Sequence, residues 1–464
     1  MIEGSNYYYR FPEVLEDRLD FIFYHPNFDK ITNLVNNLKY PLHKVGEYFI
    51  RTWTGENLEV RDSKEKKYLY VKVENVVDNK IVITENSEFL SEAELSILSN
   101  SIAKPDSILV TRVASFGKSA VVSKDFRGAI SDNILCFELN EKVEPAFISR
   151  FINSMLAKMQ LQQSVAGMGR GVLTYDRIGD LYVGVPSSRD EQRQIVEQVE
   201  SIESQAINLE NEAKTVMSQA EKVLLQKLGI NMPSKLERID YYIDFFDDLN
   251  RLDFVFNNPR YDIVEELISE SNITFVELSE VAYSLQDSRN PMESPNEQFL
   301  YADIGNIDTR WGVINPVTMY GKDAKSSRIR RVMYAGTVLV STTRPTRNAI
   351  AIVPEGLDNQ ICSTGLAVLR CKENMDNRFL FHALRTQLTN LQFEKYCSGS
   401  GYPAITQKVD LPKIKVPLPP TINDQVRIVN KIENILEEAK GKELEAKLKW
   451  QKSIDMFEYK LGGN

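Results

Sequence analysis

The most constraining feature of this chain is an internal repeat, in which the second half restates the first at a constant offset. The motif Arg-Leu-Asp-Phe at residues 18–21 returns at 251–254, and Asp-Glu-Gln at 190–192 returns as Asn-Asp-Gln at 423–425. A third motif, Lys-Leu-Gly, keeps the same offset at the end of each half. Solenoid repeats are roughly 20–50 residues long, so this period is the size of a whole domain plus a helix. We therefore expect a duplicated chain with two similar but non-identical heads.

The composition is typical of a soluble globular protein with two or three domains. The chain has 464 residues, of which 42% are hydrophobic and 26% are charged. No apolar run reaches the length of about 18 residues that a membrane span needs, and residues 1–12 lack the pattern of a signal peptide. The four cysteines form no Cys-x-x-Cys pair, which argues against a zinc site or a disulfide framework. We expect a protein of the reducing cytoplasm.

The net charge of −9 disfavours a free-standing nucleic-acid binder, because such proteins usually carry a basic surplus. The charge is unevenly distributed, however. Residues 197–212 are acid-rich, whereas Arg328, Arg330 and Arg331 form a basic cluster in the second half. Field and contact depend on local charge, so the total does not exclude nucleic-acid binding by part of the chain.

Each half has a strand-rich region followed by a long helix. Strand-like runs occupy residues 67–76, 108–110, 119–122 and 134–137, then 299–301, 338–340, 349–353 and 366–369. One short amphipathic helix is expected after each set, at 145–162 and at 377–393. We accordingly predict a first head at 1–187, a central helix at 188–230, a second head at 231–420 and a C-terminal helix at 421–464.

Apolar residues in both long helices recur at spacings of three and four, which is a heptad seam. The residues expected to pair the helices are Ile195, Val199, Ile202, Leu209, Val216, Ile428, Ile432 and Ile435. Alanines in alternate layers would allow close packing. A core helix in a bundle is the alternative for a shorter run. We predict antiparallel pairing, because the second head must fit between the helices. The fold class is then α+β: two similar strand-rich α/β heads and two long antiparallel coiled-coil helices, related by a pseudo-twofold repeat.

A glycine-rich and hydroxyl-rich stretch lies shortly before each long helix. The candidate contact residues are Gly169, Arg170 and Thr174 in the first copy, and Ser400 and Tyr402 in the second. Glycines let backbone N–H groups approach a phosphate closely, and Arg170 or Tyr402 would then touch a base or the sugar-phosphate chain. The alternative is an ordinary loop leading into the helix. Two copies at matching places favour the functional interpretation.

A second pair of candidates follows an apolar strand in each head. The residues are Arg112, Ser115 and Lys118 in the first head, and Thr342, Arg344, Thr346 and Arg347 in the second. Arginine forms bidentate pairs with guanine, and hydroxyl groups bind bases or phosphates. A single exposed arginine would mean little. A basic, hydroxyl-rich turn at the same place in both heads, with different residues, is what two DNA readers of different sequence would show.

No catalytic constellation is present in the sequence. There is no Walker loop, no His-Glu-x-x-His motif and no dinucleotide fingerprint. Residues 258–261 read Asn-Pro-Arg-Tyr, which is close to the Asn-Pro-Pro-Tyr of amino-methyltransferases. The first half carries His-Pro-Asn-Phe at 25–28, so a repeated structural turn is the better interpretation. We expect that the chain is not an enzyme by itself and holds no metal.

The repeat resembles a known family. Val-Gly-Val-Pro at 183–186 with Asp-Glu-Gln, and Val-Pro-Leu-Pro-Pro at 416–420 with Asp-Gln, are similar to the end of the target-recognition domains in specificity (S) subunits of type I restriction-modification systems. The Arg-Leu-Asp-Phe openings are also similar. The motifs are short, but their duplicated arrangement covers essentially the whole chain. One departure is Ser-Ser-Arg at 187–189, where the family usually has a second proline, and it affects only a turn.

The resemblance implies a non-catalytic prokaryotic DNA-specificity subunit of a defence system against foreign DNA. Each head would read one half of a split, asymmetric site on double-stranded DNA through the major groove, and the paired helices would fix the unread spacer. The helices would also dock two methyltransferase (M) subunits, which bind S-adenosylmethionine and flip the target adenine. Restriction (R) motor-nuclease subunits would bring ATP and Mg²⁺. No cofactor is expected in this chain itself.

Two other hypotheses remain from different classes. A pseudo-symmetric coiled-coil scaffold that binds protein partners through its heads would explain the acidic charge, and it predicts no salt-dependent DNA affinity. An enzyme with its site between the heads lacks a candidate nucleophile, base or metal set. A variant of the specificity-subunit hypothesis is the corresponding subunit of a related type II or defence system, which would differ in its partners.

Overall fold

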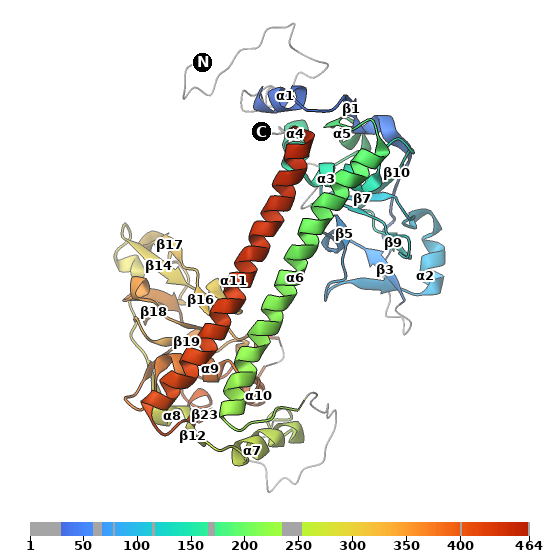
Figure 1. Ribbon diagram of the computed structural model, residues 1–464. Coiled ribbons are helices and arrows are strands. Elements are labelled where there is room, and N and C mark those ends of the chain that lie inside the picture. The colour runs from blue at the N-terminus through green and yellow to red at the C-terminus, as the bar shows by residue number, and fades with distance from the viewer. Residues whose placement is uncertain are drawn as a thin grey trace. The chain divides into compact units, whose positions relative to one another are not determined.

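The computed structural model describes residues 29–58, 67–77, 79–113, 117–165, 172–233, 253–399 and 401–462 (Figure 1). Contacts divide the chain into two compact units. The first unit comprises Met1–Glu210 and Leu444–Asn464, and the second comprises Asn211–Glu443. Each unit therefore contains one strand-rich head and part of each long helix. The division into a first head, a central helix, a second head and a C-terminal helix stays a prediction, because the two contact-based units do not test those boundaries.

The first head contains short strands and short helices. Its strands are β1 (Leu42–Lys44), β2 (Phe49–Thr54), β3 (Tyr68–Val71), β4 (Val76–Val77), β5 (Lys80–Ile81), β6 (Glu88–Leu90), β7 (Ile108–Thr111), β8 (Ser119–Val121), β9 (Gly128–Ile130), β10 (Ile134–Leu139) and β11 (Tyr182–Gly184). Its helices are α1 (Asp29–Asn36), α2 (Glu92–Ile97), α3 (Pro145–Asn153), α4 (Met155–Val165) and α5 (Tyr175–Gly179).

Two sheets face each other in the first head. One is antiparallel with the order β2-β10-β7-β8, and the other has the order β6-β3-β9 with β3 and β9 parallel. Strand β7 is buried on both faces, so its side chains alternate between two cores. Ile108 and Val110 cluster with Phe147 of α3, whereas Leu109 clusters with Leu69 of β3. The head is thus layered as helices, antiparallel sheet and second sheet.

The second head repeats this plan. Its strands are β12 (Thr274–Glu277), β13 (Ala282–Leu285), β14 (Gln298–Ala302), β15 (Ile307–Asp308), β16 (Val313–Ile314), β17 (Val317–Tyr320), β18 (Ile329–Met333), β19 (Val338–Ser341), β20 (Ile350–Ile352), β21 (Gln360–Ser363), β22 (Leu366–Cys371) and β23 (Lys415–Leu418). Its helices are α7 (Asp262–Ser269), α8 (Leu278–Val281), α9 (Asn377–Leu384) and α10 (Gln387–Tyr396).

The sheets of the second head correspond to those of the first. The antiparallel sheet has the order β13-β22-β19-β20, and the second sheet has the order β17-β14-β21-β18 with β14 and β21 parallel. Val338 and Val340 cluster with Phe379 of α9, and Leu339 clusters with Ala302 of β14. The internal repeat predicted from the sequence is therefore a repeat of architecture as well.

The long helices are α6 (Arg189–Lys227) and α11 (Ile422–Leu461). In the first unit, Val199 near the start of α6 shares a core cluster with Phe457 near the end of α11. In the second unit, Leu224 near the end of α6 shares a cluster with Ile432 near the start of α11. The two helices therefore pack together, as the heptads predict, and they run antiparallel, as the position of the second head between them in the sequence predicts.

Small residues lie deepest in the helix pair. Ala206 and Ala213 in α6, and Ala439 and Ala446 in α11, are almost completely buried, and each pair has the spacing of one heptad. Small side chains let two helix backbones approach closely. The larger residues of the heptad seam, such as Leu209, then lie beside the contact and stay half-buried. Among the eight residues expected to pair the helices, Ile195, Val199 and Ile432 are buried, and Ile202, Leu209, Val216, Ile428 and Ile435 are half-buried.

Both long helices end at a glycine in the left-handed conformation. Gly229 has φ +70° and Gly462 has φ +102°, values that favour glycine because it lacks a Cβ. The amide of Ile230 donates to the carbonyl of Leu225 at 2.9 Å, which closes the end of α6. Gly441 does not interrupt α11, and a Cβ at this position would meet no atom within 4 Å.

The prediction of one helix at 145–162 and one at 377–393 was wrong, because each is two helices. Ser154 separates α3 from α4 and has extended backbone angles. Its hydroxyl donates to the carbonyl of Phe151 at 2.6 Å and accepts from the amide of Ala157. Thr386 separates α9 from α10 and accepts from the amide of Thr389. A hydroxyl that caps a new helix offers the backbone an alternative to continuing the old one.

Candidate nucleic-acid interface

In the second head, a tight turn of residues 342–348 connects the buried strand β19 to β20. Arg344 and Asn348 adopt left-handed backbone conformations, with φ of 50° and 63°, on either side of a short 3-10 helix at Pro345–Arg347. Such angles are uncommon for residues other than glycine, and asparagine tolerates them best. The side chain of Asn348 donates to the carbonyl of Arg385 at 3.1 Å. The turn is thus held in one shape.

The glycine-rich loop of the second head lies against this turn. The amide of Arg344 donates to the carbonyl of Pro403 at 2.7 Å, and the amide of Ile405 donates to the carbonyl of Thr342 at 2.9 Å. The guanidinium of Arg344 donates to the carbonyl of Gly401 and lies 4.6 Å from the centre of the Tyr402 ring. Two segments that are far apart in the sequence therefore form one surface, which we call the second reading surface.

The first head has the same construction. The amide of Leu173 donates to the carbonyl of Arg112 at 3.0 Å, as Ile405 does to Thr342. The amide of Arg112 donates to the carbonyl of Asn133, as that of Thr342 does to Gly365. The turn after β7 and the segment before α5 therefore meet in a first reading surface, and the same two backbone bonds recur in both heads.

The candidate residues differ in exposure. Tyr402 is 74% exposed, Thr174 and Arg347 are exposed, and Arg112, Lys118, Arg344 and Thr346 are half-buried. Thr342 is buried, and its hydroxyl donates to the carbonyl of Gly365 at 2.9 Å. Its side chain therefore holds the turn and does not face solvent. Ser115, Gly169, Arg170 and Ser400 lie outside the described residues.

The sequence includes Asn348 in the candidate turn as a residue that could bind adenine, but it does not reveal the structural role of Asn348, which ends the turn and ties it to Arg385. A detectable signal was present, because an asparagine between a polar turn and an apolar strand is a frequent left-handed position. The basic cluster of the second half lies at the start of β18, an edge strand of the second sheet: Arg330 and Arg331 are on the strand, and Arg328 directly precedes it. Arg328 and Arg330 are exposed there. In the described part of the first head, the corresponding place beside β9 holds an isolated bridge between Ile102 and Ala129.

Residues 258–261 form a structural turn. The side chain of Asn258 accepts from the amide of Arg260 at 3.0 Å, and Tyr261 is 2% exposed. Its counterpart at 25–28 lies outside the described residues.

In the described part of the chain, no cluster of His, Cys, Asp and Glu side chains could hold a metal ion. None of the helices described there is long and apolar enough to cross a membrane.

A pair of heads with one architecture and diverged turn residues defines a protein with two related recognition domains. The family model described as the type I restriction modification DNA specificity domain matches residues 45–218 and 292–449. The chain therefore belongs to this family and carries its domain twice. No curated protein matches the chain.

Solved structures are similar to the chain over most of its length. A chain from a study of complex assembly and conformational transition of the type I R-M system has a TM-score of 0.51 at 17% identity, covering 91% of this chain and 96% of that one. The HsdS subunit from Thermoanaerobacter tengcongensis has a TM-score of 0.37 at 16% identity, with coverages of 91% and 97%. The S subunit from M. genitalium has a TM-score of 0.42 at 14% identity, with coverages of 91% and 96%. The first likeness supports the fold.

Proposed function

We propose that this chain is the non-catalytic DNA-specificity subunit of a type I restriction-modification complex. Each head reads one half of a split, asymmetric site on double-stranded DNA. The observation that carries the proposal is the pair of reading surfaces, built by the same two backbone hydrogen bonds in both heads. Their side chains differ, so the two heads would read different sequences.

The side chains of the reading surfaces have the chemistry that base and phosphate recognition needs. Arg344 is held by Gly401 and Tyr402 at one edge, which restricts its rotamers before DNA binds. A pre-positioned guanidinium forms a bidentate pair with guanine in the major groove. Arg347, Lys118 and Arg112 supply further cations, and hydroxyl groups such as that of Thr346 bind phosphates or bases. The exposed ring of Tyr402 is suited to apolar contact with a base or sugar.

The paired helices α6 and α11 set the length of the unread spacer and dock two methyltransferase subunits. Those subunits bring S-adenosylmethionine, and restriction subunits bring ATP and Mg²⁺ when cleavage occurs. This chain selects the DNA sequence and catalyses no reaction itself. It works in the prokaryotic cytoplasm. Its net charge of −9 is compatible with DNA binding if the methyltransferase subunits make many of the phosphate contacts.

The same net charge favours one competing function, a protein-binding scaffold without DNA readout. The two functions differ in salt dependence, since each phosphate contact releases counterions and steepens the fall of affinity with salt. The test is selection of random double-stranded DNA by the complex of this chain with its methyltransferase subunit. A bipartite motif bound in a salt-dependent way supports the proposal. Unselected, salt-independent binding with the complex intact supports the scaffold.

A further inference from the structure

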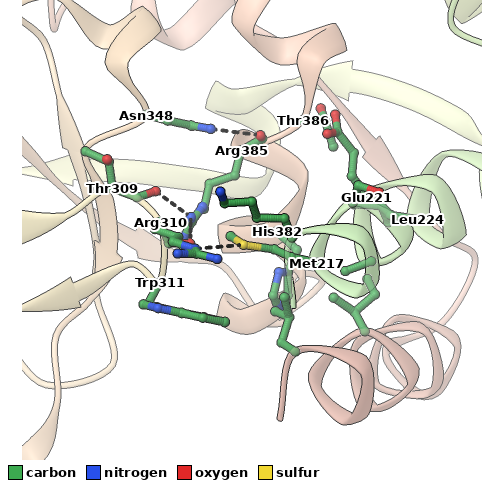
Figure 2. A pocket seen from close by; sticks show the side chains of 15 residues that line it. Met217, Glu221, Leu224, Thr309, Arg310, Trp311, Asn348, His382, Arg385 and Thr386 are labelled. Carbon is green, nitrogen blue, oxygen red and sulfur yellow. Dashed lines mark hydrogen bonds between the residues drawn. The ribbon is translucent and has the colours of Figure 1, made fainter. Parts of the chain in front are cut away.

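Each unit contains a cavity where its head meets the helix pair. The cavity of the first unit is small, about 50 Å³, and is lined by α3, α6 and α11. The cavity of the second unit is about 370 Å³ and is lined by residues of α6, α9 and α11 and of the turn at 309–311. Figure 2 shows the second cavity, with Arg385, His382 and Met217 among its lining side chains.

The two cavities occupy corresponding places in the repeat. Counted back from Ser154 and Thr386, which follow the equivalent helices α3 and α9, Arg150 corresponds to His382. By the same count, Asn153 corresponds to Arg385. Glu203 of α6 corresponds to Leu436 of α11 at the offset of the repeat. The second unit thus has an arginine, Arg385, three residues beyond the position that corresponds to Arg150. At the position of Glu203 it has the aliphatic Leu436.

The first cavity is filled by a buried ion pair. The guanidinium of Arg150 binds the carboxylate of Glu203 through two hydrogen bonds of 2.5 and 2.9 Å, and the two side chains are 5% and 8% exposed. Glu200 adds a third contact at 3.2 Å. In the first unit, the arginine at this position is therefore neutralised by a carboxylate of the same chain.

In the second cavity, the guanidinium of Arg385 has backbone partners in place of a paired carboxylate. Arg385 donates through Nη2 to the backbone carbonyls of Thr309 and Arg310, at 2.7 Å each. Within the described residues it forms no ion pair with a carboxylate. Glu221 lines the cavity, but its carboxylate accepts from the amide of Gln387 at 2.6 Å. Arg310 is already paired with Glu443.

The lining of the second cavity carries the cations Lys214, Arg310 and Arg385 and the carboxylate of Glu221, and the nearby Asp308 attracts the charge of Arg385. Burial lowers the pKa of Arg385 to about 10, so its guanidinium stays protonated. Burial lowers the pKa of His382 to about 3, so its imidazole is neutral. The remaining wall includes aliphatic side chains such as Leu224 and Leu436.

We propose that the second cavity is a binding site for a small aliphatic carboxylate, which takes the place that Glu203 fills in the first unit. The carboxylate pairs with Arg385 and Lys214, and the aliphatic body lies against Leu224 and Leu436. The cavity adjoins the second reading surface, because Asn348, which ends the turn of that surface and donates to the carbonyl of Arg385, also lines the cavity. The carboxylate comes from a free molecule or from an acidic side chain of a partner.

The test uses cyclohexanecarboxylate as a probe and cyclohexanecarboxamide as its uncharged match. Both are titrated into the full chain, with binding followed by calorimetry and by tryptophan fluorescence, to which Trp311 of the cavity lining contributes. We expect saturable binding of the carboxylate, on the order of tenfold tighter than the amide, because charged hydrogen bonds are the stronger ones. Equal binding of the two probes, or no saturable binding, would overturn the proposal.

A matched pair of variants locates the site. Leu436→Glu supplies the carboxylate from within the chain and should abolish probe binding, whereas the isosteric Leu436→Gln should keep the preference for the charged probe. If Leu436→Glu does not fold, the double variant His382→Arg with Leu436→Glu is used in its place, because it reproduces the Arg150–Glu203 pair of the first unit. Unchanged probe binding in the folded glutamate variant would overturn the proposal.

A titration of the chain in complex with its methyltransferase subunit identifies the source of the carboxylate. Retained probe binding in the complex assigns the site to a free molecule. Probe binding that is lost on assembly, while the isolated chain keeps it, assigns the site to an acidic side chain of the partner. Either result supports a carboxylate site.

Discussion

Gln192 and Gln425 occupy the same place in the two halves, and each buried amide joins the start of a long helix to the start of a short one. The oxygen of Gln192 accepts from the amide of Glu144, which caps α3. The oxygen of Gln425 accepts from the amide of Asp376, which caps α9. Both side chains are 0% exposed. The repeated glutamine therefore connects the head to the long helix through buried hydrogen bonds in both halves.

Replacing this joint should destabilise the first unit. Gln192→Met keeps the shape of the side chain but removes its hydrogen bonds to Glu144, Lys142 and Pro186. Each buried polar group left unpaired costs about 1–3 kcal/mol of folding free energy. Water that enters the site would pair with some of these groups and so lower the summed cost. We expect a loss of about 2–4 kcal/mol in urea unfolding. The exposed Gln194→Met is the control, and equal stability of the two variants would count against the joint.

Arg344 should determine base preference at the second half-site. Arg344→Ala should weaken binding there by about 1–3 kcal/mol and relax the preference. Arg344→Lys keeps the charge but loses the planar fork, so it should retain general affinity and lose the preference. The measurement is selection of half-site sequences by the assembled complex. An unchanged motif in both variants would remove Arg344 from the reading surface.

Insertion of one heptad after Ala206, with a matching heptad between Ala439 and Ala446, should lengthen the spacer between the half-sites. The heptad period keeps the buried alanines in register, so both half-site sequences should be unchanged. The measurement is the bipartite motif selected by the variant. Loss of the half-site preferences with an intact complex would contradict the role of the helices as a spacer.

A charge in the helix pair should prevent assembly. Val199 is 2% exposed and shares its core cluster with Phe457. Val199→Asp buries an unpaired carboxylate, a change that costs several kcal/mol. We expect loss of binding to the methyltransferase subunit, measured by size-exclusion chromatography with light scattering. Gln198→Asp, on the exposed neighbouring residue, should assemble normally. Normal assembly of Val199→Asp would show that the seam is wrongly assigned.

His382 should make the second unit sensitive to acid. Burial and the nearby Arg385 lower its pKa from 6.5 to about 3, so the unfolded chain binds the proton first. Stability from this group is therefore complete above pH 6.5 and is lost as the pH falls toward 3, by on the order of 1 kcal/mol per pH unit. Hydrogen exchange of α9 amides, corrected for intrinsic rates, measures this loss between pH 7 and 5.5.

The neutral variant His382→Gln should remove most of this dependence on pH. His43→Gln, in the first unit, is the matched control and should leave the exchange of α9 unchanged. The same pH slope in the original chain and in His382→Gln would show that the imidazole does not report on folding in this range.

The sequence predicts this fold well wherever a local signal is strong. The heptads predict the pairing of α6 and α11, the Lys-Leu-Gly motifs lie at the left-handed ends, and strong apolar runs predict β7 and β19. It fails at Ser154 and Thr386, where one hydroxyl splits a helix that the hydrophobic pattern continues. The close packing expected from alanines in alternate layers of the seam is also confirmed, because these alanines are almost completely buried.

The candidate site is less predictable than the fold. The sequence places Arg344 and Tyr402 in two separate turns, and only the backbone bonds from Pro403 and Thr342 show that the turns form one surface. Thr342 looks like a contact residue in sequence but is buried. The exchange of the Arg150–Glu203 pair for His382 and Leu436 is visible only when the two heads are compared element by element. These relationships depend on long-range contacts, which residue patterns do not encode.

The central claim is that this chain chooses the DNA sequence that its complex modifies. The most direct measurement is methylome sequencing of a host that expresses this chain with its methyltransferase subunit, compared with a host that lacks this chain. We predict a new split motif with methyladenine in both halves, present only when the chain is expressed. If no new motif arises while the complex forms and the methyltransferase is intact, the chain does not specify DNA and the scaffold function replaces the one proposed.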